Sequence, residues 1–212
     1  MAVYQTLKKG FKQRRRWLKR RLHTCPLWYQ EPDFIFIHIN KTGGSSIEKA
    51  LNLPFEHLTA MEKRAEVGAD KWEQKFTFAF VRNPFDKVCS HYRYRVKTNQ
   101  TSLKDRGLSF SQWVDETYGR QNPDYYDNPK MFMPQSQWLT DEGGHLLVDE
   151  VYRFERLSDD FRQVTERFKL NTSLPHLKAS KKTDYQQWYD EATKQTVADW
   201  FAEDLRRFGY CF

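Results

Sequence analysis

Residues 33–51 read DFIFIHINKTGGSSIEKAL, and this stretch decides the fold. Its first part, residues 33–39, is a nearly continuous apolar, β-branched and aromatic run that is too short for a helix. Such a run predicts a strand that is buried on both faces of a parallel sheet. Gly43 and Gly44 then predict a turn, and Ile47, Ala50 and Leu51 follow at helical spacing. The order of strand, glycine turn and helix is typical of an anion-binding loop.

A second apolar run, FTFAFV at residues 76–81, predicts another buried strand. It leads into Arg82-Asn83-Pro84, which predicts a helix with Asn83 as its N-cap and Pro84 in its first turn. Asp86 is expected to reach back to this cap.

The rest of the chain continues the alternation of strands and helices. Thr59 and Glu62 have the spacing of a capping box, and residues 109–112 have it too. We expect a strand over residues 146–154, a helix capped by Ser158, and a last helix that ends at Gly209. This pattern predicts an α/β fold: a three-layer, P-loop-like domain with a mainly parallel central sheet flanked by helices.

The positive charge is concentrated at one end of the chain. The 212 residues carry a net charge of +7, but residues 1–30 hold nine basic and no acidic side chains. The other 182 residues therefore carry 26 basic and 28 acidic groups, a net charge of −2. We predict a basic tail over 1–30 and a domain over 31–212. The tail is either a solvated, disordered extension or an amphipathic helix for an anionic membrane surface or a polyanion.

Composition excludes several classes of protein. With 39% hydrophobic residues the chain is not wholly disordered, and no apolar run approaches the ~20 residues of a membrane span. Its three cysteines lie far apart, which disfavours a disulfide framework or a zinc ribbon. These features lead us to expect a cytoplasmic protein, or one held peripherally at a membrane.

The glycine turn predicts a phosphate site of an unusual kind. The amides of residues 42–46, the hydroxyls of Thr42, Ser45 and Ser46, and the Lys41 ammonium would surround the anion. In the P-loop of NTPases the lysine follows the glycines and is itself followed by a magnesium-binding hydroxyl. Here Lys41 precedes the glycines, so we expect phosphate binding without the usual magnesium nucleotide.

A second phosphate site is predicted at the end of the other strand. Arg82 would project from the carboxyl edge of the sheet, where open α/β sheets bind ligands. Ser90, two turns into the next helix, could face the same point. Two phosphate sites on neighbouring strands indicate a nucleotide that is phosphorylated at two places.

These two motifs carry a family resemblance. Residues 37–46 (IHINKTGGSS) resemble the 5′-phosphosulfate loop of sulfotransferases, and residues 80–92 (FVRNPFDKVCSHY) resemble their 3′-phosphate motif. The Golgi-type and bacterial carbohydrate sulfotransferases are the most similar group. Weaker matches at residues 153–157, 174–180 and 204–210 extend the resemblance over about 33–212. Asn40 departs from the proline that many members carry.

The resemblance implies a sulfotransferase that uses 3′-phosphoadenosine 5′-phosphosulfate (PAPS), leaves 3′,5′-ADP (PAP) and needs no metal. Lys41 would act at the leaving phosphate oxygen, and Arg82 and Ser90 would hold the 3′-phosphate. A late basic loop, residues 178–182, would close over that phosphate, or it is a solvated run of charges. The remaining donor-binding positions that the resemblance implies are Thr42, Gly43, Gly44, Ser45, Ser46, Ser180 and Lys181.

The acceptor, which the resemblance implies to be a carbohydrate, needs a base for its hydroxyl. His57 lies where related enzymes place a catalytic histidine, and we favour it as the base over the alternative of a surface histidine in a loop. His38 is expected to be a buried core histidine, and Glu48 and Glu56 are reserve bases, Glu48 more simply a helix-surface charge. Candidates for the acceptor cleft are Tyr125, Tyr126, Gln135, Trp138 and Arg153, although core packing would explain Trp138 about as well.

Two other functions stay open. An ATP-dependent kinase of P-loop type would have the same layout, but the order of Lys41 and the glycines disfavours it. A non-enzymatic polyanion-binding protein could use the tail. Specific nucleic-acid binding is not expected, because the domain itself is slightly acidic.

Overall fold

The computed structural model describes residues 31–175 and 184–212, and residues 33–212 form one compact unit. The basic tail over 1–30 and the loop residues His176, Ser180 and Lys181 lie outside the described residues. Their predicted roles, and the domain boundary at residue 30, therefore stay predictions.

The central sheet is parallel, as predicted. Its three strands are β1 (Phe34–Ile37), β2 (Phe76–Val81) and β3 (Glu150–Arg153), in the order β1-β2-β3. The register pairs Phe34 with Phe76 and Phe78 with Glu150. The second strand has the predicted bounds, whereas the other two are shorter than predicted.

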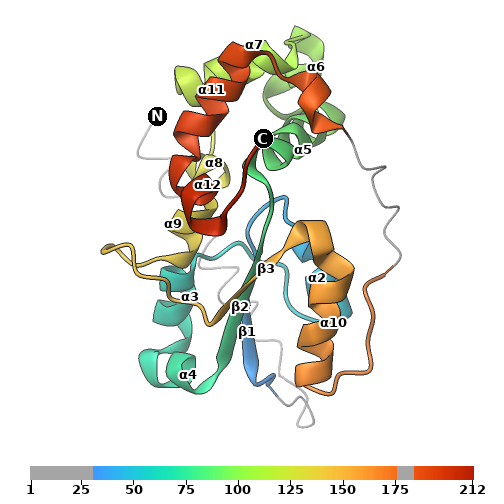
Figure 1. Ribbon diagram of the computed structural model, residues 1–212, viewed down its shortest axis with the longest axis vertical. Coiled ribbons are helices and arrows are strands. Elements are labelled where there is room, and N and C mark those ends of the chain that lie inside the picture. The colour runs from blue at the N-terminus through green and yellow to red at the C-terminus, as the bar shows by residue number, and fades with distance from the viewer. Residues whose placement is uncertain (1–30, 176–183) are drawn as a thin grey trace, which may run out of the picture. The chain divides into compact units, whose positions relative to one another are not determined.

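Side-chain alternation buries both faces of this sheet. Phe34, Phe36, Phe78 and Phe80 pack on one face, against helices α2 (Gly44–Ala50) and α10 (Leu157–Arg167). Residues 35, 37, 79 and 81 pack on the other face, against α3 (Ala60–Val67), α4 (Ala69–Gln74) and α9 (Gln135–Leu139). Figure 1 shows α2 and α10 on one side of the strands and α3 and α4 on the other. The α/β layered fold is therefore confirmed.

A third core lies beyond the carboxyl ends of the strands (Figure 1). Its centre includes the fully buried Trp113, Phe132 and Phe201. The helices that build it are α5 (Pro84–Lys97), α6 (Leu103–Arg106), α7 (Phe110–Val114), α8 (Pro129–Phe132), α11 (Glu191–Trp200) and α12 (Ala202–Phe208). This helical layer and the sheet edge together position the predicted site.

Local capping follows the sequence in three places and departs from it in two. Thr59 and Ser109 each form a capping box, and the Asn83 side chain accepts a hydrogen bond from the Phe85 amide. Ser158 does not cap α10, which begins at Leu157. The last helix is two helices, α11 and α12, although Gly209 ends the second with φ 61° as predicted.

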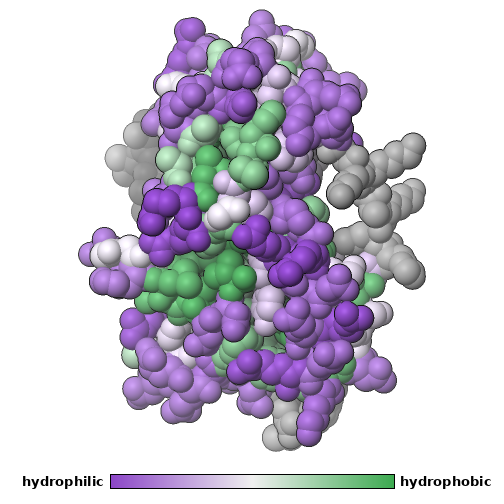
Figure 2. All heavy atoms as spheres, viewed as in Figure 1, coloured by the Kyte–Doolittle hydropathy of each residue, from purple (hydrophilic) through white to green (hydrophobic). Residues whose placement is uncertain are grey.

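One face of the molecule is mainly polar. On the face shown in Figure 2 hydrophilic side chains predominate, interrupted by hydrophobic surface near the C-terminal end, where Phe212 is exposed. Within residues 31–175 and 184–212 we find no helix with the length and apolarity that a membrane crossing needs.

Candidate active site

The loop after β1 is shaped by two glycines with different tasks. Gly43 has φ 86°, a left-handed conformation that costs little only for glycine. A Cβ on Gly44 would lie 1.9 Å from the His38 ring, so glycine is needed there for close approach. Lys41 has φ 67° although it is not a glycine. The chain therefore turns sharply at Lys41, directly before the start of α2.

The three predicted hydroxyls have different surroundings. Thr42 is buried, and its hydroxyl donates to the Ile39 carbonyl at 2.8 Å, so it holds the loop to the strand end. Ser46 is buried as well, whereas Ser45 is exposed. The amides of Gly44 and Ser45 open α2, where N–H groups have no acceptor within the helix.

Lys41 and Arg82 meet at the carboxyl edge of the sheet. Arg82 donates to the Lys41 carbonyl at 3.1 Å, pairs with Asp86 at 2.8 Å, and lies 4.1 Å from the Phe154 ring centre. The sequence predicts that Asp86 reaches back to the helix cap. This prediction is wrong, because Asp86 pairs with Arg82 instead. Burial and the Arg82 charge lower the pKa of Lys41 to about 8. Two neighbouring cations, of which Arg82 is paired with the Asp86 carboxylate, leave excess positive charge for an anion.

One face of α5 forms the wall opposite this loop. Asp86, Ser90 and Tyr94 are spaced four residues apart, so they lie along the same side of the helix. Asp86 contacts Arg82, and the Lys41 ammonium lies 4.1 Å from the Tyr94 ring centre. Ser90 therefore lies on α5 between Asp86, which contacts Arg82, and Tyr94, which contacts Lys41.

A buried polar unit that the sequence did not indicate holds the Arg82 backbone. The Gln135 carboxamide accepts from the Arg82 amide at 2.9 Å and donates to the Arg82 carbonyl at 2.8 Å. Asp204 in turn accepts from the Gln135 and Ser136 amides. Both Gln135 and Asp204 are fully buried. The sequence signal for Asp204 is the weak family match at residues 204–210, whereas Gln135 is a residue that the sequence led us to expect in an acceptor cleft.

His57 has the geometry of a base. Its Nδ1 lies 3.0 Å from the His38 carbonyl oxygen, which can only accept, so Nδ1 carries the proton and Nε2 keeps its lone pair. Burial lowers the pKa of His57, although the hydrogen bond to His38 opposes this effect. The ring is therefore neutral at neutral pH.

His38 and Glu48 form a buried pair behind His57. His38 Nδ1 lies 2.8 Å from Glu48 Oε1, and the rings of His38 and His57 are 4.2 Å apart. The prediction of a buried, hydrogen-bonded His38 is confirmed. The prediction that Glu48 is a surface charge is wrong, because its side chain turns inward to His38 and to the Glu56 amide. Glu56 itself pairs with Lys63 at 2.6 Å.

A sequence profile of the sulfotransferase family matches residues 29–211, nearly the whole chain. The chain belongs to this family. Among solved structures, the crystal structure of a sulfotransferase from Alicyclobacillus acidocaldarius matches with 16% identity and a TM-score of 0.48. That match covers 84% of this chain and 94% of the other. A comparison with curated protein sequences finds no match.

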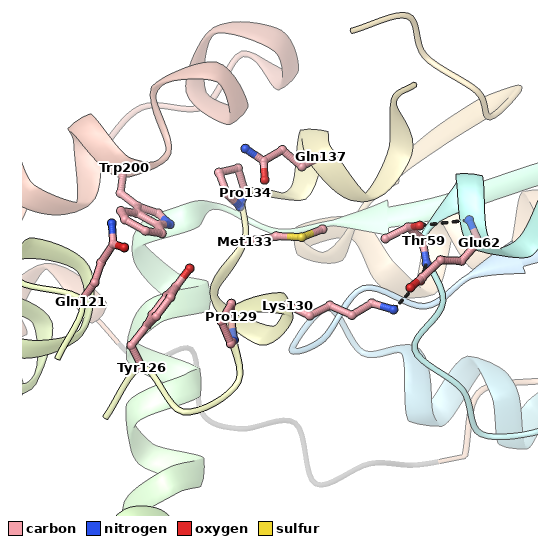
Figure 3. A pocket seen from close by; sticks show the side chains of 10 residues that line it. All are labelled: Thr59, Glu62, Gln121, Tyr126, Pro129, Lys130, Met133, Pro134, Gln137 and Trp200. Atoms are coloured by element: carbon pink, nitrogen blue, oxygen red, sulfur yellow. Dashed lines mark hydrogen bonds and ion pairs between the residues drawn. The ribbon is translucent and has the colours of Figure 1, made fainter. Parts of the chain in front are cut away.

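A groove of about 650 Å³ in this sulfotransferase is lined in part by Thr59, two residues after His57 (Figure 3). Of the residues predicted for an acceptor cleft, only Tyr126 lines this groove. Trp138, Gln135 and Tyr125 are buried in the core, and Arg153 bonds the Phe208 carbonyl. The groove residues that the sequence did not single out for an acceptor cleft are Thr59, Glu62, Gln121, Pro129, Lys130, Met133, Pro134, Gln137 and Trp200.

Proposed function

We propose that this sulfotransferase transfers a sulfuryl group from PAPS to a hydroxyl of a carbohydrate acceptor. The hydrogen bond from Arg82 to the Lys41 carbonyl carries the proposal, because it joins the two predicted phosphate motifs in one place. Family membership supports the reaction class, and the arrangement of charges supports a donor with two separated anionic groups.

The donor-binding residues suit such an anion chemically. The loop amides of residues 43–46 and the Lys41 ammonium would hold the 5′-phosphosulfate, and Arg82 with Ser90 would hold the 3′-phosphate. The Arg82 guanidinium keeps N–H groups beyond those used by Asp86 and Lys41, and its planar fork suits a phosphate. PAPS supplies an activated sulfuryl group when it is bound.

The chain's own residues then have three tasks in the reaction. His57 Nε2 would take the proton of the acceptor hydroxyl while that oxygen bonds to sulfur. The Lys41 ammonium would offset the negative charge that grows on the phosphate oxygen as the old S–O bond breaks. The buried Gln135 and Asp204 keep Arg82 at the sheet edge, so that donor and acceptor meet in a fixed orientation.

Thermal unfolding with added nucleotides tests the donor assignment. At saturation, we expect PAP without metal to raise the melting temperature by about 5–10 °C, since ligand binding adds about 3 kcal/mol at a hundredfold excess over Kd. Arg82→Ala should remove most of this shift, and Ser90→Ala should reduce it. A shift with Mg-ATP and none with PAP would favour the kinase alternative and overturn the proposal.

Replacing His57 tests the base. We expect His57→Ala to lower kcat by about 10² to 10⁴, the range for loss of a general base, while PAP binding stays unchanged. His145→Ala is the matched control, because His145 is an exposed histidine on another loop that pairs with Asp141. Turnover as fast in His57→Ala as in His145→Ala would show that His57 is not the base and would favour the alternative of a surface histidine.

The pH dependence of PAP binding tests the charge on Lys41. A lysine with a pKa of about 8 is charged below pH 8 and neutral above it, and PAP binds the charged form. We therefore expect the affinity, measured by calorimetry, to fall about fivefold between pH 8 and pH 9. Lys41→Arg should remove this decrease, because arginine stays charged. A decrease that persists in the variant would assign the titration to Lys87, whose pKa burial also lowers to about 8.

A further inference from the structure

The groove beside His57 has two chemically different ends. Figure 3 shows Tyr126, Trp200 and Gln121 at one end and Thr59, Glu62 and Lys130 at the other. Between the two ends lie Pro129, Met133 and Pro134, with Gln137 at the rim.

The charged end of the groove adjoins the predicted base. The ring centre of Trp138 lies 5.4 Å from the Lys130 ammonium and 6.2 Å from the His57 ring centre, so both residues contact one indole. The Asn40 side chain donates to the Met131 carbonyl at 2.8 Å, which ties α8 to the residue before Lys41. A molecule in the groove would therefore end beside His57 and near the donor loop.

The uncharged lining suits a sugar. Trp200 donates its indole N–H to the Phe132 carbonyl, so the part of its ring that lines the groove is apolar. Aromatic faces of this kind pack against the C–H faces of sugar rings. Gln121 and Gln137 are exposed, and each amide can both donate to and accept from hydroxyl groups. Gln121 holds its place with φ 50°, a conformation that glycine would adopt more easily.

The charged lining decides between acidic and neutral sugars. Among the described residues that line the groove, Lys130 and Glu62 are the charged ones, and they pair with each other. Burial would raise the pKa of Glu62, but hydrogen bonds from Lys130 and Thr59 outweigh it and hold the pKa below its ordinary value. The pair therefore presents no net charge to the groove. An acidic sugar would lie near the Glu62 carboxylate, and the cation of the described lining, Lys130, is already paired with that carboxylate.

We propose that this groove binds the acceptor and that the acceptor is an uncharged saccharide. The inference rests on the proposed function for the reaction, but its binding test does not need turnover. The full chain is titrated with chitotetraose and maltotetraose as neutral probes, and with hyaluronan and heparosan tetrasaccharides as acidic ones. Saturation-transfer NMR reports the binding of each probe, and calorimetry reports PAP binding separately.

We expect at least one neutral probe to bind at least about tenfold more tightly than either acidic probe, with or without PAP. PAP binding without any binding of neutral saccharides would overturn the inference and leave the donor assignment intact. Neutral saccharides that bind to a protein without PAP affinity would support the groove and overturn the proposed donor.

Two glutamine variants test whether the saccharide binds in the groove. Gln121→Gly removes an amide while easing the backbone, and Gln137→Ala removes an exposed amide; each should weaken the neutral probe about fivefold. Gln74→Ala, an exposed glutamine on α4, is the control and should change nothing. Equal affinity in all three variants would contradict a saccharide in this groove.

The last variant changes the charge preference. Glu62→Gln keeps an oxygen for the capping box of α3 but leaves Lys130 uncompensated. We expect the affinity for the acidic tetrasaccharides to rise about tenfold relative to the neutral ones. Glu66→Gln on the same helix, which lies outside the groove lining, should leave the preference unchanged. A preference that does not change in Glu62→Gln would show that the Lys130–Glu62 pair does not select the acceptor.

Discussion

Lys41→Ala should lower kcat for sulfuryl transfer about a thousandfold without loss of stability. The ammonium lies at the end of β1, beside Arg82, where charge on the leaving phosphate would develop. Removing one preorganised electrostatic group from such a site costs about 10² to 10³ in kcat, and a full charge lies at the upper end of that range.

Stability should respond in a different way, and this makes the prediction specific. Burial and Arg82 lower the pKa of Lys41 to about 8, so the charged lysine is held at a cost in the folded protein. The alanine variant removes that cost and loses the contact of the ammonium with Tyr94, worth about 1 kcal/mol. The free energy of unfolding in urea should therefore stay within about 1 kcal/mol of the unchanged protein. Retained turnover would remove Lys41 from the mechanism, and a collapse of the fold would make its role structural.

Secondary structure could be predicted where a local sequence pattern is compatible with one structure only. The run at residues 76–81 is apolar on both faces because both faces of β2 are covered, so its bounds agree with the sequence. The caps at Thr59, Ser109 and Asn83 depend on neighbouring residues only, and all three are present.

Some element boundaries were predicted wrongly because they depend on contacts between residues that are far apart in the sequence. The predicted strand over 146–154 starts at Glu150, because Asp149 and Thr77 bond through side chains at its start. The single last helix is divided at Phe201, which has φ −105° and is fully buried in the third core. No glycine or proline marks that division, so the sequence pattern continues across it.

The candidate site was predictable in part for the same reason. Arg82 directly follows β2 and Lys41 follows the end of β1 by four residues, and residues just beyond neighbouring parallel strands meet at one sheet edge. Glu48 could not be placed correctly, because its inward turn depends on His38, ten residues away on the strand end. Gln135 is 53 residues from its partner Arg82, and no local pattern relates the two.

Asp204→Ala should destabilise the fold by about 3–5 kcal/mol, the largest stability effect that we expect from one substitution. Asp204 is fully buried and accepts from the Gln135 amide at 2.7 Å, from its side-chain amide at 3.2 Å, and from the Ser136 amide at 2.8 Å. Alanine would leave these buried donors without an acceptor. It would also remove the negative charge that favours the charged form of the buried Lys87.

Urea unfolding of matched variants separates this role from a general effect of losing an aspartate. Asp199→Ala is the control, since Asp199 is an exposed aspartate near the end of α11 and should cost less than about 1 kcal/mol. Asp204→Asn keeps one acceptor oxygen but points an amide at other donors, so its loss should lie between those of the two alanine variants. Because Gln135 binds both backbone groups of Arg82, Asp204→Asn should also weaken PAP binding while the protein stays folded. An Asp204→Ala variant as stable as Asp199→Ala would show that Gln135 keeps its place, and its two hydrogen bonds to the Arg82 backbone, without Asp204.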